Sequence, residues 1–425
     1  MSPSIKSERG AILIHVAVAL VGLIAFTAFV VDYGVMWVSR GQAQTAADAG
    51  ALSGAVALAF DGATDFAGAQ EKARVVARSN AVFGRSPDVQ PTDVTFPPCP
   101  PGAPGLPDTC VKVDAYRNAE RGNPLPIFFG QLVGVASQGV VATATAQVVT
   151  GDSTDCLKPW AVVDRWQEYG PEGYLPTSTF DRYSTGQGQA PPPEADLYIP
   201  PGGVNGTGTG FRLPDDEGAR FAVKTEGTEI SSGWFREILL PRADGHWTGG
   251  DVYRENIETC GGLPYSIAQP GVACPADIGQ DDAAYWAARG CFGVKTGGTT
   301  GPTRQGVEVL ISRDPGASYN GGTRQIVGSA YSPPTRSPRV VPIGVMDVDD
   351  FLSRNPTGAT GVVRLVNIFG FFIEGMGEVE TDGSMTLRAS GKAVIGRIVT
   401  IPSLASGSSP LPESASFLRT IILVR

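Results

Sequence analysis

The sequence predicts an α+β fold in three parts: a long N-terminal transmembrane helix, a small α+β module continuous with it, and a β-rich, loop-rich domain containing disulfides. Three observations predict this fold. An uncharged apolar segment lies near the N-terminus, small residues at helical spacing follow it, and the remaining chain alternates short apolar runs with glycine, proline and six cysteines. The predicted boundaries are 1–10 for a cytoplasmic N-terminus, 11–31 for the transmembrane helix, 32–150 for the module and 151–425 for the extracytoplasmic extension.

The composition indicates a folded, turn-rich chain and argues against one class of partner. A chain of 425 residues can bury the cores of two or three domains. Glycine (55 residues) and proline (34 residues) recur without a collagen-like period, which favours short strands and many turns. The net charge is −9, and the sequence contains no run of Lys or Arg that could bind along a phosphate backbone. We therefore expect no nucleic-acid partner.

The apolar segment from Ala11 to Val31 has the properties of a membrane span. It contains no Asp, Glu, Lys or Arg over about 21 residues, close to the roughly 20 that a helix needs to cross the hydrocarbon. This is longer than the core of a signal peptide, so we expect the segment to be retained. Lys6 and Arg9 precede it while only Arg40 follows closely, which places the N-terminus in the cytoplasm.

The helix is expected to continue beyond Asp32 to about Phe60, because no proline interrupts it and small residues recur at helical spacing. From Arg9 this gives a rod of about 75 Å at roughly 1.5 Å per residue. A stripe of small residues allows another backbone to approach closely. Two interpretations stay open: the stripe packs on the protein's own next domain, or it docks another subunit. The helix-packing residues of this stripe are Ala43, Ala47, Gly50 and Gly54.

The six cysteines all lie beyond the apolar segment, which indicates an oxidising compartment and three disulfides. No close pair such as C-x-x-C is present to bind zinc. A bond between Cys99 and Cys110 would staple a hairpin and contribute roughly 2–3 kcal/mol, and pairing with distant cysteines is the alternative. The other four allow three pairings, of which we favour Cys156 with Cys260 and Cys274 with Cys291.

Alternating and helical patterns predict the remaining elements. The last strand is so apolar that it must be paired, and we expect it in the extension's own sheet. A hairpin turn is expected at Asp382-Gly383. For the module we expect helices at 65–83 and 126–133 and strands at 89–96, 111–116 and 139–149. For the extension we expect strands at 219–224, 340–345, 362–373, 393–401 and 417–424, and helices at 281–289 and 302–311.

No group of residues predicts catalysis. His246 is the one histidine beyond the membrane, since His15 lies in the span, and a histidine in a turn is the favoured interpretation. No serine stands in a G-x-S-x-G motif. Asp347, Asp349 and Asp350 are carboxylates of the kind that calcium prefers, but an acidic helix N-terminus explains them better. We therefore expect a non-enzyme with no catalytic, cofactor-binding or metal-binding residue, no cofactor and no small-molecule substrate.

Five motifs lie in the first 150 residues: Glu8-Arg9-Gly10, Val31-Asp32-Tyr33-Gly34, Gln42 to Leu52, Pro126 to Gly134 and Val140 to Val148. In these motifs the N-terminal region resembles that of TadG-like Flp pilus-assembly proteins, part of the bacterial tight-adherence machinery. The resemblance covers about residues 8–150 and implies a pilin-like module, while the cysteine-bearing extension resembles that of other TadG-related proteins. Related pilin-type precursors are cut after a glycine with Glu five residues beyond it, but here Gly10 is followed by His15 at that place, so we expect no cut.

The resemblance implies a non-enzymatic component of Flp pilus assembly or secretion that acts through helix packing and protein–protein contacts. Its partners would be other pilus-assembly or pseudopilin-like subunits and, through its single span, the membrane. It would lie in the inner (cytoplasmic) membrane with its C-terminal domain in the periplasm. The alternative is a membrane-tethered periplasmic enzyme or a cell-surface binding module, with its site in residues 151–425.

Overall fold

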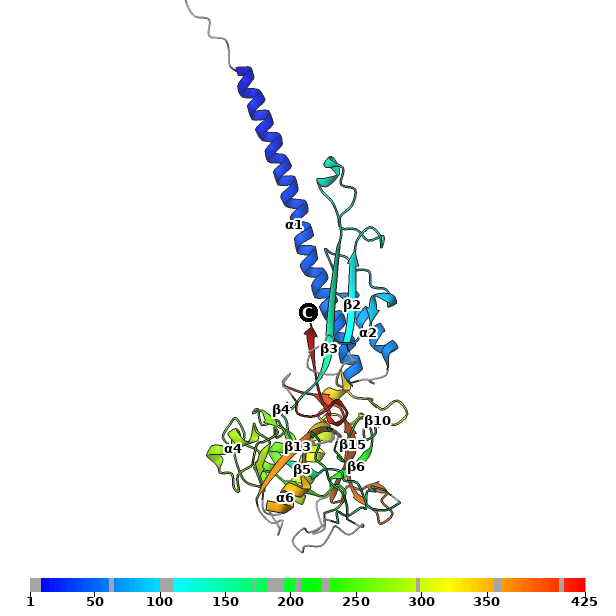
Figure 1. Cartoon of the computed structure of the whole chain (residues 1–425), viewed down its shortest axis with the longest axis vertical. Helices are drawn as coiled ribbons and strands as arrows, with labels where there is room; N and C mark the ends of the chain where they lie inside the picture. The colour runs from blue at the N-terminus through cyan, green and yellow to red at the C-terminus, as the bar shows by residue number, and fades with distance from the viewer. Residues whose placement is uncertain are drawn as a thin grey trace, which may run out of the picture.

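A computed structural model describes the chain over residues 9–60, 65–99, 110–171, 173–181, 195–202, 206, 208–223, 230–295, 299–354, 361–404 and 409–424. It shows a long helix, α1 (Arg9–Phe60), whose first half projects from the rest of the molecule (Figure 1). The second half of α1 belongs to a module (residues 32–150), whose other elements pack along it, and a head (residues 151–417) lies at the end far from the N-terminus. The predicted α+β class is confirmed, whereas residues 1–8 of the predicted N-terminal segment lie outside the described residues.

Helix α2 (Phe66–Ser79) runs beside α1 and begins at an Asp65 cap, whose carboxylate accepts a hydrogen bond from the Gly68 amide at 2.8 Å. The sequence predicted this helix to reach Phe83, but it ends four residues earlier. Asn80 has extended backbone angles, and its side-chain amide donates to the Val76 carbonyl at 2.8 Å. The side-chain amide of Asn80 thus occupies the Val76 carbonyl in place of the helical backbone hydrogen bond, which ends the helix.

The module's five-stranded sheet has the order β1-β2-β3-β17-β16. It packs on α1 and α2 through a core made largely of alanine and valine. The sequence placed the last strand in the extension's sheet, and this prediction was wrong: β17 pairs antiparallel with β3 along Thr145–Thr150. The bounds are β1 (Val94–Thr95), β2 (Cys110–Arg117), β3 (Val140–Thr150), β16 (Ile401–Pro402) and β17 (Leu418–Val424).

The head is built on an eight-stranded sheet with the order β6-β15-β13-β12-β5-β7, in which β9 and β14 also pair with β13. The predicted turn at Asp382-Gly383 joins β13 to β14, with Gly383 at φ +81°. Its strands are β5 (Trp160–Val163), β6 (Arg220–Val223), β7 (Phe235–Glu237), β9 (Cys291–Gly293), β12 (Val340–Met346), β13 (Val362–Val379), β14 (Met385–Leu387) and β15 (Ala393–Val399).

Helices cover both faces of the head sheet. One face packs against α3 (Gly250–Glu258) and α5 (Thr300–Arg313), and the other against α4 (Gln280–Ala287) and α6 (Val348–Arg354). Asp347 accepts a hydrogen bond from the Asp350 amide at 2.9 Å, which is the acidic helix start that the sequence favours. The smaller elements are β4 (Ser153–Thr154), β8 (Tyr265–Ser266), β10 (Ser318–Asn320), β11 (Gln325–Val327) and the 3-10 helices η1 (Pro91–Asp93), η2 (Gly130–Val133), η4 (Pro334–Arg336) and η5 (Glu413–Ala415).

Candidate functional site

The small-residue stripe of α1 is covered by the protein's own module. Ala43, Ala47, Gly50 and Gly54 all lie on the buried side of the helix. A Cβ added at Gly50 would lie 2.8 Å from the Cβ of Ala77, and one at Gly54 would lie 2.8 Å from Cγ1 of Val111. The stripe therefore brings α1 into close contact with α2 and β2. The interpretation of this face as a docking surface for another subunit is not what the structure shows, because no room is left on it.

The other half of α1 is exposed and long enough to cross a membrane. Its large apolar side chains from Ile12 to Val30 are about half to three-quarters exposed, and an 18-residue window has a mean hydropathy of 2.6. At the end of this segment, the rings of Phe29 and Tyr33 stack with their centroids 5.7 Å apart, and Trp37 follows at 6.4 Å from Tyr33. Tyr and Trp in such a row are typical of the boundary between hydrocarbon and water.

Asp32 ties a distant loop to α1 at this boundary. Its carboxylate accepts backbone hydrogen bonds from Phe128 at 2.8 Å, Phe129 at 3.0 Å and Gly130 at 2.6 Å. The sequence predicted a helix over 126–133, but only the short η2 forms, and it ends at Gly134, which has a φ of +86°. We call residues 126–138 the tip loop, which in Figure 1 reaches from the ends of β2 and β3 along α1.

An apolar groove separates the tip loop from α1. It has a volume of about 550 Å³ and is lined on one side by the last turns of the apolar segment and on the other by the loop. Sequence reasoning did not foresee this arrangement, although two of the motifs that carry the resemblance contain Asp32 and the tip loop. A further signal was present: no charged residue occurs from Gly122 to Gly151. The residues that meet across the groove include Ile24, Ala28, Ile127, Phe129 and Val135.

His246 lies in an exposed ion-pair cluster on the head. Its ring nitrogen is 3.5 Å from Glu255 and 3.8 Å from Asp244, and its side chain is 61% exposed. Both carboxylates already face Arg242, with contacts of 3.0 Å each, and the backbone amide of His246 holds the pKa of Asp244 below its ordinary value. The group has the ligand types for a cation, but Arg242 faces both carboxylates and already offsets one of their two charges.

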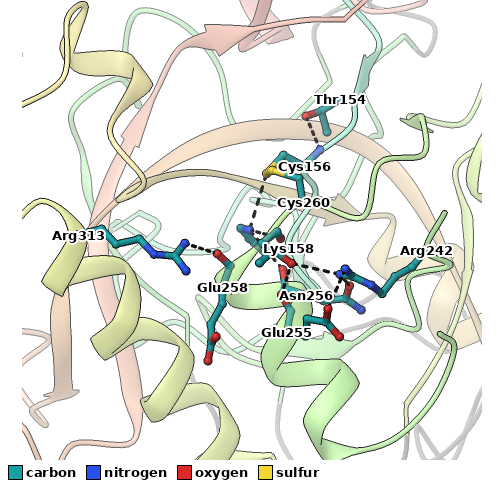
Figure 2. Close-up of a disulfide and its surroundings, with 10 residues drawn as sticks. Thr154, Cys156, Lys158, Arg242, Glu255, Asn256, Glu258, Cys260 and Arg313 are labelled. Carbon is teal, nitrogen blue, oxygen red and sulfur yellow. Dashed lines mark hydrogen bonds and ion pairs between the residues drawn. A yellow bond between two sulfur atoms is a disulfide. The ribbon is translucent and has the colours of Figure 1, made fainter. Parts of the chain in front are cut away.

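The disulfides pair Cys99 with Cys110, Cys156 with Cys260 and Cys274 with Cys291, the same pairs that the sequence analysis favours. Figure 2 shows the surroundings of the second pair, where the buried Lys158 amine donates to the carbonyls of Asn256 at 3.3 Å and Thr259 at 2.9 Å. These carbonyls belong to the C-terminal end of α3, so the lysine caps that helix. Burial, with Arg313 and Arg242 nearby, lowers the pKa of Lys158 to about 7.

These features define a class of protein: a chain with one apolar helix long enough to span a membrane, whose exposed continuation is built into an α+β module. Residues 10–57 match the family model described as putative Flp pilus-assembly TadE/G-like. The resemblance predicted from the sequence is thereby confirmed for this segment, which is nearly all of α1. No curated protein and no solved structure matches the chain.

Proposed function

We propose that the protein is a non-enzymatic, membrane-anchored component of Flp pilus assembly or secretion. The observation that carries this proposal is the family match over residues 10–57, which coincides with the apolar span and the rod beyond it. The N-terminus would lie in the cytoplasm, and the module and head would lie in the periplasm at the inner membrane. The three disulfides in these regions are consistent with an oxidising compartment.

The structure supports action through protein contacts on the head or on the exposed half of α1. The head is joined to the module twice, once through β3 and again through β17, so a force on the head reaches the rod through two strands. The groove beside the rod is apolar, whereas the His246 cluster is exposed and its two carboxylates face Arg242. A cluster that is open to water and tied into ion pairs favours a structural role over catalysis.

Deletion of the gene tests the assignment to the pilus system. We expect a loss of surface fibres in electron micrographs and a loss of adherence to a solid surface, both restored by the full-length chain. A second complementing chain, in which residues 11–31 are replaced by an unrelated apolar span, separates simple anchoring from specific helix contacts. Unchanged piliation in the deletion strain, with the other pilus genes expressed, would refute the proposal.

The proposed orientation is tested separately. A fluorescent protein that matures only in the cytoplasm, fused before Met1, is expected to fluoresce. Glu71, which is 57% exposed on α2, is replaced by cysteine and treated in intact spheroplasts with a thiol reagent that does not cross membranes. Labelling of Glu71→Cys is expected, and protection of this thiol until the membrane is permeabilised would show the opposite orientation.

A further inference from the structure

The tip loop presents apolar side chains to its surroundings with no charged residue near it in the sequence. Phe128 is 55% exposed, Val135 is 45% exposed and Phe129 is 37% exposed. The nearest charged residues along the chain are Arg121 and Asp152, well outside the loop. Single exposed apolar side chains are ordinary on a soluble protein, but a group of this size on an uncharged loop indicates an interaction surface.

The level of the loop along α1 indicates what covers this surface. Its amides bind Asp32, one residue after the predicted span, and the groove beneath it extends along α1 from Met36 back to Val21. Val21 precedes Asp32 by about three helical turns, or roughly 16 Å. If α1 crosses a bilayer at residues 11–31, this side of the groove lies within the leaflet that faces the module. The row of Tyr33 and Trp37 marks the edge of the same leaflet.

Several backbone groups of the loop are hydrogen-bonded, as an apolar environment demands. An unpaired amide or carbonyl in hydrocarbon costs several kcal/mol, so irregular backbone is tolerated there only when its polar groups are paired. Asp32 accepts three amides of the loop. The amides of Gly134 and Val135 donate to carbonyls within η2, and the Leu125 amide donates to the Gln138 carbonyl. These backbone groups thus face inward, while Phe128 and Val135 present apolar side chains outward.

We propose that the tip loop inserts into the leaflet that faces the module, and that acyl chains of this leaflet's lipids fill the groove between the loop and α1. Lipid is the occupant that the geometry favours, because the groove is continuous with the helix surface that a bilayer already covers. The wall is almost wholly apolar, which suits an acyl chain. Asp32 holds the loop in place and is a positioning residue. The inference rests on the membrane anchoring in the proposed function and not on its pilus role.

The test uses full-length protein reconstituted in vesicles of phosphatidylethanolamine and phosphatidylglycerol. Single cysteines are introduced by Phe128→Cys in the tip loop, Phe26→Cys in the span and Glu71→Cys on α2, and each is labelled with an environment-sensitive fluorophore. The six native cysteines are paired and do not compete for the label. Quenching by spin-labelled acyl chains reports lipid contact, and quenching by iodide reports water contact.

We expect severalfold stronger quenching by spin-labelled lipid at positions 26 and 128 than at position 71, and the opposite order with iodide. A label at 128 that iodide quenches while the label at 26 stays in lipid would overturn the insertion but leave the anchoring intact. A label at 128 shielded from both quenchers would mean that protein covers the groove, which also overturns the proposal. Failure at position 26 would refute the anchoring itself.

The role of Asp32 is tested in the same vesicles with Asp32→Asn added to Phe128→Cys. The asparagine has one acceptor oxygen instead of two, so it cannot hold all three amides. We expect lipid quenching at position 128 to fall severalfold while the label at position 26 and the thermal unfolding of the head stay unchanged. Unchanged quenching at 128 would overturn the positioning role of Asp32.

Discussion

The buried cores of the module and the head are built from side chains of very different size. The module's buried cluster consists of alanine, valine and two leucines, so its helices and sheet approach closely. In the head, aromatic rings fill both faces of the sheet; Phe369, for example, lies against the rings of Phe211 and Phe417. The two regions are therefore expected to lose stability through opposite substitutions: the head when a buried side chain is made smaller, and the module when one is made larger.

The largest expected effect is truncation of an aromatic ring in the head. Phe369→Ala should lower the free energy of unfolding of the head by about 3–5 kcal/mol, because the cavity left among fixed rings cannot close. Denaturant unfolding followed by tryptophan fluorescence measures the loss. Leu387→Ala, at a side chain that is 49% exposed, is the control and should change little. A loss for Phe369→Ala no larger than that of the control would contradict the view of the head core as fixed.

Two disulfides with loops of similar length allow a matched comparison. Replacing Cys99 and Cys110 by serine should cost the module roughly 2–3 kcal/mol, because the chain-entropy model assigns such a loop that stabilisation. Replacing Cys274 and Cys291 by serine should cost the head a similar amount, differing by less than about 0.5 kcal/mol for the longer loop. Limited proteolysis under denaturant separates the two regions. A loss that appears in the other region would show that they unfold together.

Adding a single methyl group should distinguish the two sides of α1. Gly50→Ala forces a Cβ to 2.8 Å from Ala77 and should destabilise the module by about 1–3 kcal/mol. Gly41→Ala meets no atom within 4 Å and should instead stabilise the helix by roughly 0.5–1 kcal/mol. Thermal unfolding of both variants in the same detergent gives the comparison. Equal effects would mean that the close approach of α1 and α2 is unimportant.

A change of pH dependence is also expected, and only in the head. Burial raises the pKa of Asp164 to about 7, against hydrogen bonds from the amides of Phe211 and Arg165. The folded head therefore holds a proton between about pH 4 and pH 7 that the unfolded chain has released, so its stability falls as pH rises through this window. Asp164→Asn should flatten most of this slope in denaturant titrations at several pH values. An unchanged slope would show that Asp164 is not the group responsible.

Asp347 is the second group that acts in this window. Burial also raises its pKa, and the charge of Asp350 adds to the effect. The contribution of Asp347 to the stability of the head therefore also falls as pH rises. A small residual slope in Asp164→Asn is therefore expected. In the double variant with Asp347→Asn the slope should decrease further, and a steeper slope would contradict the assigned direction.

The parts of the fold that follow from local pattern were predictable from the sequence. The α1 rod follows from uninterrupted helical spacing, and the turn at Asp382-Gly383 follows from its residue types. The errors arose where distant residues decide. The apolar β17 had to be paired, but its choice of β3 depends on the path of the chain through the head. The predicted 126–133 helix is reduced to the short η2, in a loop whose contacts include the carboxylate of Asp32, nearly a hundred residues earlier.

The candidate site was accessible to sequence reasoning only in pieces. Asp32 and the tip loop each belong to a motif of the resemblance, yet nothing in either motif shows that a carboxylate and three amides meet. The small-residue stripe was recognised as a packing surface, but spacing alone cannot tell whether the partner is another chain or the same one. The contacts of Gly50 and Gly54 with the module decide that question.

The return of β17 to the module sets an order of events during biosynthesis. Synthesis starts at the N-terminus, so β3 is made long before β17, which follows the whole head. Until then β3 lacks its partner along Thr145–Thr150 and presents an open strand edge. A chain interrupted anywhere in the head keeps that edge open and is a substrate for proteases or aggregation. Completion of the module's sheet thus depends on synthesis of the whole head.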